Sequence, residues 1–126
     1  METIANVLVG LVALEHLYIL YLEMFAWETK GKKTFKGSLR PELFTPTKVL
    51  AANQGLYNGF LSAGLIWSFF ITDKTWSTNV AIFFLGCVIV AGIFGALTAS
   101  RKIFFIQALP AIAALVAVLV RRLGSY

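Results

Sequence analysis

The chain has 126 residues, of which 59% are hydrophobic and only 13% are charged. Roughly half of a soluble domain is apolar and about a quarter is charged, so this composition excludes an ordinary soluble domain and indicates a polytopic membrane protein. The net charge of +5 does not indicate nucleic-acid binding, because the basic residues form short islands of the kind that flank membrane spans. Cys87 is the single cysteine, which excludes an intrachain disulfide and a thiolate metal cage.

The first apolar run covers residues 4–27 and is long enough to cross a bilayer. No basic segment precedes it, so we do not interpret it as a cleaved signal peptide. The run contains Glu15, His16 and Glu23. Ionisable groups are costly in hydrocarbon and rare there, so we expect these three either to pair or to serve a function. His16 and Glu23 are seven residues apart, which places them on the same helix face.

The polar connection at residues 28–47 is the longest in the chain. Pro41 and Pro46 prevent a regular helix from running through it. Thr45 followed by Pro46 predicts the start of the second helix, with Thr45 as the N-cap.

Three further apolar runs follow at residues 49–71, 79–99 and 103–120. Small residues recur every four positions in two of them, which predicts close contact between helices at both stripes. The stripe of the second run is Gly55, Gly59 and Ala63, and that of the third run is Cys87, Ala91, Gly95 and Ala99.

The four runs together predict one domain over residues 1–126, an all-α, four-helix transmembrane bundle. The first and third loops hold eight Lys and Arg residues, against three on the other side. Basic loops favour the cytoplasm, so we expect both termini outside (N-out/C-out).

Polar side chains recur at similar depth in this bundle. Asn53, Gln54 and Asn58 fall in the cytoplasmic half of the second helix, and Gln107 falls in that of the fourth. We expect them to converge with Glu23 on a polar pocket, near Glu15 and His16 at the bilayer midplane. The alternative is that the amides only join helices and that Glu15 and His16 form a structural pair. The candidate ligand-binding or proton-active residues are therefore Glu15, His16, Glu23, Asn53, Gln54, Asn58 and Gln107.

The chemistry available to these residues is narrow. A histidine beside carboxylates can shuttle protons, because the unperturbed pKa of histidine is about 6.5. With one histidine and no His-x-x-x-His pair, we expect no metal site. The sequence contains no phosphate loop and no dinucleotide fingerprint, so it identifies neither a cofactor nor a catalytic residue.

Three stretches carry a family resemblance: LEHLYILYLEM at residues 14–24, ANQGLYNG at residues 52–59 and GIFGALT at residues 92–98. They resemble a bacterial membrane family known as domain of unknown function 1304, and the resemblance covers nearly the whole chain. It implies a compact four-span inner-membrane protein and supplies no activity. A weaker similarity is to four-helix glutathione-using membrane enzymes. Those enzymes rely on an Arg-rich second helix, whereas here that helix has no Arg after Lys48.

We therefore expect a membrane module that binds or transports a small polar or amphipathic ligand. Glu15 and His16 would couple this binding or transport to the gain or loss of a proton. One alternative is a membrane enzyme of isomerase or transferase type, with His16 and Glu23 as acid and base on a lipid-soluble substrate. Another is a structural partner subunit without its own chemistry. The expected partners are the lipid bilayer and a small-molecule or lipid ligand, without nucleic acid, and a homo-oligomer is left open.

Overall fold

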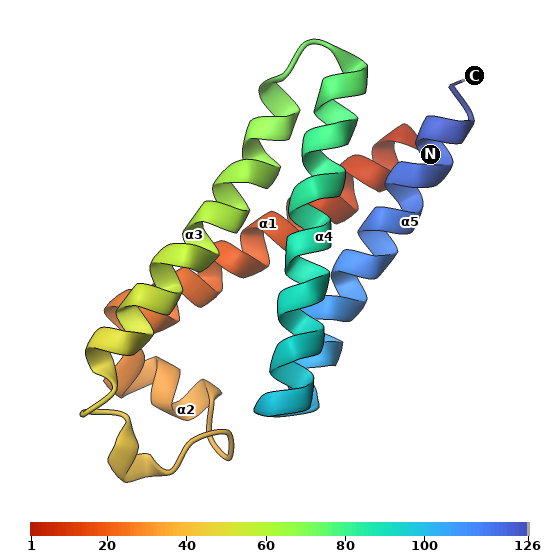
Figure 1. Ribbon diagram of the computed structural model, residues 1–126. Coiled ribbons are helices and arrows are strands. Elements are labelled where there is room, and N and C mark those ends of the chain that lie inside the picture. The colour runs from red at the N-terminus through yellow and green to blue at the C-terminus, as the bar shows by residue number, and fades with distance from the viewer. Residues whose placement is uncertain (126) are drawn as a thin grey trace. The chain divides into compact units, whose positions relative to one another are not determined.

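The computed structural model describes residues 1–125, whose regular elements are all helices, with no strand among them (Figure 1). The predicted all-α class is therefore confirmed. The α-helices are α1 (Glu2–Phe25), α2 (Lys32–Thr34), α3 (Lys48–Phe70), α4 (Lys74–Thr98) and α5 (Leu109–Leu123). The π-helical turns η1 (Trp27–Gly31) and η3 (Phe104–Ala108) and the 3-10 turn η2 (Pro41–Leu43) complete the order.

Three helical segments are long and apolar enough to cross a membrane, namely Glu2–Phe25, Lys74–Thr98 and Phe104–Leu123. They correspond to the first, third and fourth expected spans. The helix α3 forms where the second span was expected but is not among the three. Its first half carries Asn53, Gln54 and Asn58, which lower its hydropathy. A fourth span, and with it the four-helix bundle and its orientation, stay predictions.

The helix boundaries follow local signals. The helix α4 begins five residues before the expected span, because the Asp73 carboxylate caps it by accepting from the backbone N–H of Trp76 at 2.9 Å. The helix α5 ends at Leu123, with Arg121 and Arg122 in its last turn. Cations there interact favourably with the negative end of the helix dipole.

Contacts divide the chain into two compact units, which we describe separately. The terminal unit comprises residues 1–14 and the chain from Leu61 onward, and the central unit comprises Glu15–Phe60. The expectation of one domain stays a prediction.

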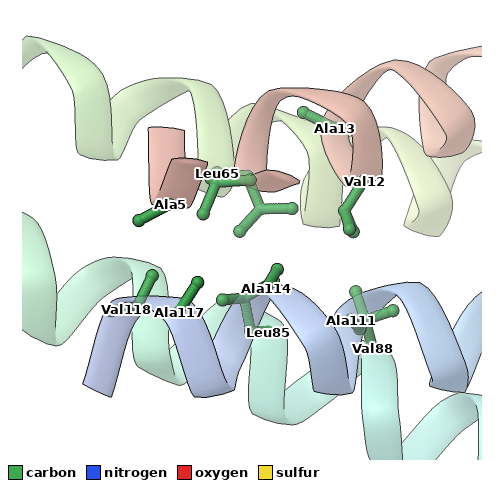
Figure 2. Packing of buried hydrophobic residues seen from close by; sticks show 11 residues of the cluster. Ala5, Val12, Ala13, Leu65, Leu85, Val88, Ala111, Ala114, Ala117 and Val118 are labelled. Carbon is green, nitrogen blue, oxygen red and sulfur yellow. The ribbon is translucent and has the colours of Figure 1, made fainter. Parts of the chain in front are cut away.

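Small side chains dominate the core of the terminal unit (Figure 2). Ala111, Ala114 and Ala117 follow one another at three-residue spacing, so they lie on one face of α5. They face residues from the start of α1 and the end of α3, such as Ala5 and Leu65, in the same cluster. Side chains of this size let helix backbones approach closely.

A close approach to the backbone of another segment occurs in the terminal unit at Gly92 of α4. A Cβ atom there would lie 2.8 Å from both the backbone nitrogen and the Cβ of Ala108 in η3. Gly95, one turn along, has a similar contact with Ile103. The predicted stripe was correct at Gly95 and wrong at Ala91, which is exposed. In α4 these contacts are therefore made by Gly92 and Gly95, which are three residues apart, and not by residues four apart as predicted.

The π-helical turn η3 has a local cause. The backbone N–H of Leu109 donates to the carbonyl of Phe104, a bond across five residues. Pro110 has no N–H and cannot donate to Ile106, so the regular α-helical ladder is interrupted at this point. Gln107 lies within this turn and is half-buried.

In the central unit, the connection between α1 and α3 is organised around Trp27. Its indole N–H donates to the Thr47 hydroxyl at 3.1 Å, and its ring packs on those of Phe44 and Phe35, with centroids 4.8 and 5.6 Å away. The prediction of Thr45 as N-cap was wrong, since α3 begins at Lys48. The Thr45 hydroxyl instead donates to the Glu28 carboxylate at 2.9 Å, which satisfies it away from the helix start.

Glu28 should make stability depend on pH. Its carboxylate accepts from Thr45 and lies 3.2 Å from the Lys48 ammonium, and these two contacts, the first being larger, hold the pKa of Glu28 below its ordinary value. Because the folded pKa is the lower one, the stabilisation is present above the unfolded pKa and is lost as pH falls through the folded pKa. We expect Glu28→Gln to lower the melting temperature slightly at about pH 7 and not at about pH 3.

The matched control is Glu42→Gln, whose carboxylate is exposed and lies 3.7 Å from Arg40. Melting curves of the three proteins across this pH range test the prediction. A Glu28→Gln difference that is constant with pH would contradict it.

Candidate functional site

The inward face of α1 in the central unit carries two ionisable residues. His16 is 1% exposed and Glu23 is 7% exposed, and Ile19 between them is also buried. Spacings of three and four residues place all three on one side of the helix. The local sequence thus directs a histidine and a carboxyl group to positions that an ordinary helix would fill with apolar residues.

Glu23 is held by α3. The side-chain amide of Asn58 donates to its carboxylate at 2.6 Å and also donates to the backbone carbonyl of Gln54 at 3.2 Å. The short distance to Glu23 is typical of a strong hydrogen bond to a carboxyl group. Asn58 is half-buried, so this pair is partly shielded from the surroundings.

Two glycines of α3 make this pairing possible. A Cβ at Gly55 would lie 2.7 Å from Cγ of Met24 and 3.0 Å from Cβ of Glu23, and one at Gly59 would lie 2.6 Å from Cδ1 of Leu20. Only residues without a side chain allow α3 to lie this close to α1. Asn58 lies between Gly55 and Gly59 in the sequence, so the close approach brings it to Glu23. The predicted stripe therefore makes contact at both glycines, whereas Ala63 is exposed and lies outside the central unit.

The remaining candidate residues are placed differently. Asn53 and Gln54 have exposed side chains, so Gln54 contributes its backbone carbonyl rather than its amide. Asn53 is five residues from Asn58, about 140° away around the helix, which explains why it does not share the contact. Gln107 belongs to the terminal unit. The structure therefore brings Glu23 and Asn58 together, with the Gln54 backbone beside them.

Glu15 is half-buried, and its Oε1 atom is buried without a hydrogen-bond partner among residues 1–125. A buried acceptor without a partner is costly and therefore uncommon. This oxygen marks Glu15 as a polar group that the described residues do not fully satisfy.

The terminal unit contains polar residues that the sequence did not identify as a site. Arg121 donates to Asn6 at 2.9 Å and to Thr78 at 3.3 Å, although the sequence presented it only as a basic flank. These partners are remote in sequence, and no local pattern indicates them.

Comparison with known proteins places the chain in a family. It matches the family model described as "Protein of unknown function (DUF1304)" over residues 10–119. It is 34% identical over 117 residues to the uncharacterized protein YpaA of Lactococcus lactis, covering 92% of this chain and 97% of that protein.

A shorter match, 63% identical over 31 residues, is to an uncharacterized protein of Haemophilus influenzae and covers 25% of this chain and 39% of that protein. No solved structure matches the chain. The resemblance predicted from residues 14–24, 52–59 and 92–98 is confirmed, and the chain belongs to the DUF1304 family.

Proposed function

We propose that this protein is an integral membrane protein that binds a small polar or amphipathic ligand at Glu23 and Asn58 and couples binding to protonation of Glu23. The observation that supports the proposal is the 2.6 Å hydrogen bond between these two side chains in helices of largely apolar sequence. Glu15, with its unpartnered buried oxygen, and His16 lie on the same helix and are the further proton-active groups of the proposal.

A purely structural role for the pair explains the burial of Glu23 less well than a function does. Glu23 is the third residue from the end of α1, where a carboxylate can reach the interface at low cost, yet it is only 7% exposed. A polar hydrogen bond between membrane helices contributes only about 1 kcal/mol. A Leu–Leu contact would join α1 and α3 without burying a polar group, so the inward carboxyl group at position 23 is better explained by a function.

The pair offers a ligand both kinds of hydrogen-bonding partner. The two bonds of Asn58 both use its amide nitrogen, so its side-chain carbonyl oxygen stays an acceptor for a ligand. The Glu23 carboxyl group accepts hydrogen bonds when ionised and donates one when protonated. Gain or loss of one proton would therefore change which ligand group binds best.

A thermal-shift screen of the purified full chain in neutral detergent tests the binding proposal. The panel contains amino acids, polyamines, sugars and short-chain amphipathic alcohols. We expect a compound that raises the melting temperature of the wild type and of Glu42→Gln, but not of Glu23→Gln. Compounds that shift all three proteins equally, or a panel without any shift, would contradict the proposal. Conversion of a bound compound that is lost in His16→Ala would favour the enzyme alternative.

We further propose that α3 is a fourth span and that both termini face the outside of a bacterial inner membrane. The 23 residues of α3 extend about 35 Å, more than the roughly 30 Å of the hydrocarbon core. The surrounding lipid is then the main partner, and the mass of the purified protein in detergent shows whether it also forms a homo-oligomer.

Cysteine labelling tests this orientation in a Cys87→Ala background. We expect Ser125→Cys to react with a membrane-impermeant maleimide in intact cells, and Ser38→Cys to react only after permeabilisation, because the basic connection lies in the cytoplasm. Both positions are exposed, so accessibility within the protein does not limit the reaction. Labelling of Ser38→Cys in intact cells would overturn the orientation.

A further inference from the structure

A polar pocket of about 510 Å³ lies in the terminal unit, where the start of α1 and the end of α5 both contribute to its lining. Its walls come from the start of α1, the turn between α3 and α4, the start of α4 and the end of α5. Its charged and strongly polar lining includes Glu2, Asn6, Lys74, Thr78, Arg121 and Arg122.

Arg121 lines this pocket and is held in place by residues of two other helices. Its side chain is only 14% exposed, and its guanidinium donates to Asn6 of α1 and to Thr78 of α4. Both acceptors are neutral, so they orient the guanidinium without cancelling its charge. The carboxylate of Glu2 is 3.8 Å away and 66% exposed, so solvent weakens this attraction. A guanidinium has five N–H donors, and these two hydrogen bonds leave three for another partner.

The pocket also has an excess of positive charge. Lys74, Arg121 and Arg122 oppose the single carboxylate of Glu2, which gives the charged side chains of the lining a net +2. Arg122 is oriented by a hydrogen bond to Asn79 at 3.3 Å, again a neutral acceptor. The hydroxyls of Thr72 and Thr75 add donors to the same lining.

A simpler explanation is that the two arginines only complement the dipole of α5 and flank a membrane span. That explanation requires exposed cations on one helix. It does not account for the burial of Arg121 or for the two partners that α1 and α4 supply to it. Phe69 and Ile71 give the pocket an apolar wall as well, which a simple basic flank does not need.

We propose that this pocket binds a phosphate ester anion, either the phosphate of a lipid headgroup or a soluble phosphomonoester. Fixed guanidinium groups match the oxygens of phosphate with paired hydrogen bonds. The volume lies within the roughly 300–1,000 Å³ of small-molecule sites. The pocket also lies at the ends of candidate spans, the depth at which lipid phosphates are found. This site lies in a different unit from Glu23 and does not depend on the ligand proposed there.

The test compares two double variants of the full chain, purified in neutral detergent. Lys74→Gln with Arg122→Gln removes two charges from the pocket, and Arg101→Gln with Lys102→Gln removes two charges beyond the other end of α4. Inorganic phosphate, at ionic strength matched with chloride, probes a soluble anion by calorimetry. Short-chain phosphatidylglycerol, compared with short-chain diacylglycerol, probes the lipid phosphate by native mass spectrometry.

We expect at least one phosphate probe to bind the wild type, and diacylglycerol not to compete with it. The pocket variant should raise the dissociation constant about tenfold or more, because each bond to a charged group contributes at least that factor. The control variant should change it less than about twofold. Binding of phosphatidylglycerol alone identifies a headgroup site, and binding of inorganic phosphate identifies a soluble ligand.

Absence of binding by both probes would overturn the proposal. Equal weakening in both double variants would also overturn it, because it would show a diffuse attraction of anions that does not distinguish the pocket from the other end of α4. If the pocket double variant fails to fold, Lys74→Gln alone serves as the pocket variant, because Lys74 is exposed. It is then compared with Lys102→Gln, which is exposed as well.

Discussion

Gly92→Ala should destabilise the protein, whereas the same change at Gly86 on the same helix should stabilise it or leave it unchanged. A methyl group at Gly92 would lie 2.8 Å from the backbone nitrogen of Ala108, and backbone cannot rotate away as a side chain does. Overpacking of this kind costs about 1–3 kcal/mol. At Gly86 an added methyl group meets nothing within 4 Å, and alanine favours the helix by about 1 kcal/mol.

The two variants carry the same substitution six residues apart in α4, so the comparison removes the effect of helix propensity. Thermal melts in one detergent should place Gly92→Ala below the wild type and Gly86→Ala at or above it. A Gly92→Ala protein that melts at or above Gly86→Ala would show that η3 and α4 are not closely packed in solution.

Asn58→Leu should destabilise the protein by about 1–3 kcal/mol, because it removes the hydrogen bond that holds the buried Glu23 carboxyl group. Asn53→Leu is the matched control, since it changes the same residue type in the same helix at an exposed position. We expect that control to be within about 0.5 kcal/mol of the wild type. Free energies of unfolding in mixed micelles, or melting temperatures in one detergent, give the comparison.

A double-mutant cycle makes this prediction specific to the pair. In a Glu23→Leu background, Asn58→Leu should cost much less, because no buried carboxyl group is left without its partner. If Asn58→Leu costs the same in both backgrounds, the residue contributes packing rather than a hydrogen bond to Glu23. Equal effects of Asn58→Leu and Asn53→Leu would also contradict the prediction.

The contact at Gly92 and the pairing of Glu23 with Asn58 both depend on glycines that let two segments lie close together. In both cases glycine removes the side chain that would separate two helices, and the space is filled by the neighbouring segment. At Gly92 the result is a close contact with η3, and at Gly55 it is a polar pair between α1 and α3. Small residues thus determine where polar side chains of different helices can meet.

The sequence by itself determined the helical class, three of the four expected membrane-compatible helices and the family. Long apolar runs and their limits are local properties, so they can be recognised without knowing how helices pack. The burial of Glu23 on one face of α1 and the close approach at Gly55 followed from the same periodicity. The prediction of Thr45 as the N-cap rested on a local turn signal rather than on periodicity, and it was wrong. In the folded connection the Thr45 hydroxyl donates to the Glu28 carboxylate instead.

Only the tertiary structure decided which side chains meet. Of the amides expected near Glu23, Asn58 and not Asn53 pairs with it, across 35 residues of sequence, and Arg121 donates to Asn6 across 115. Such pairs depend on the rotation and axial shift of one helix against another. One residue along a helix turns a side chain by about 100°, which is why Gly92 rather than Ala91 makes the contact with η3. A single-chain pattern specifies the faces of helices but not their mutual register, and the register places the polar groups.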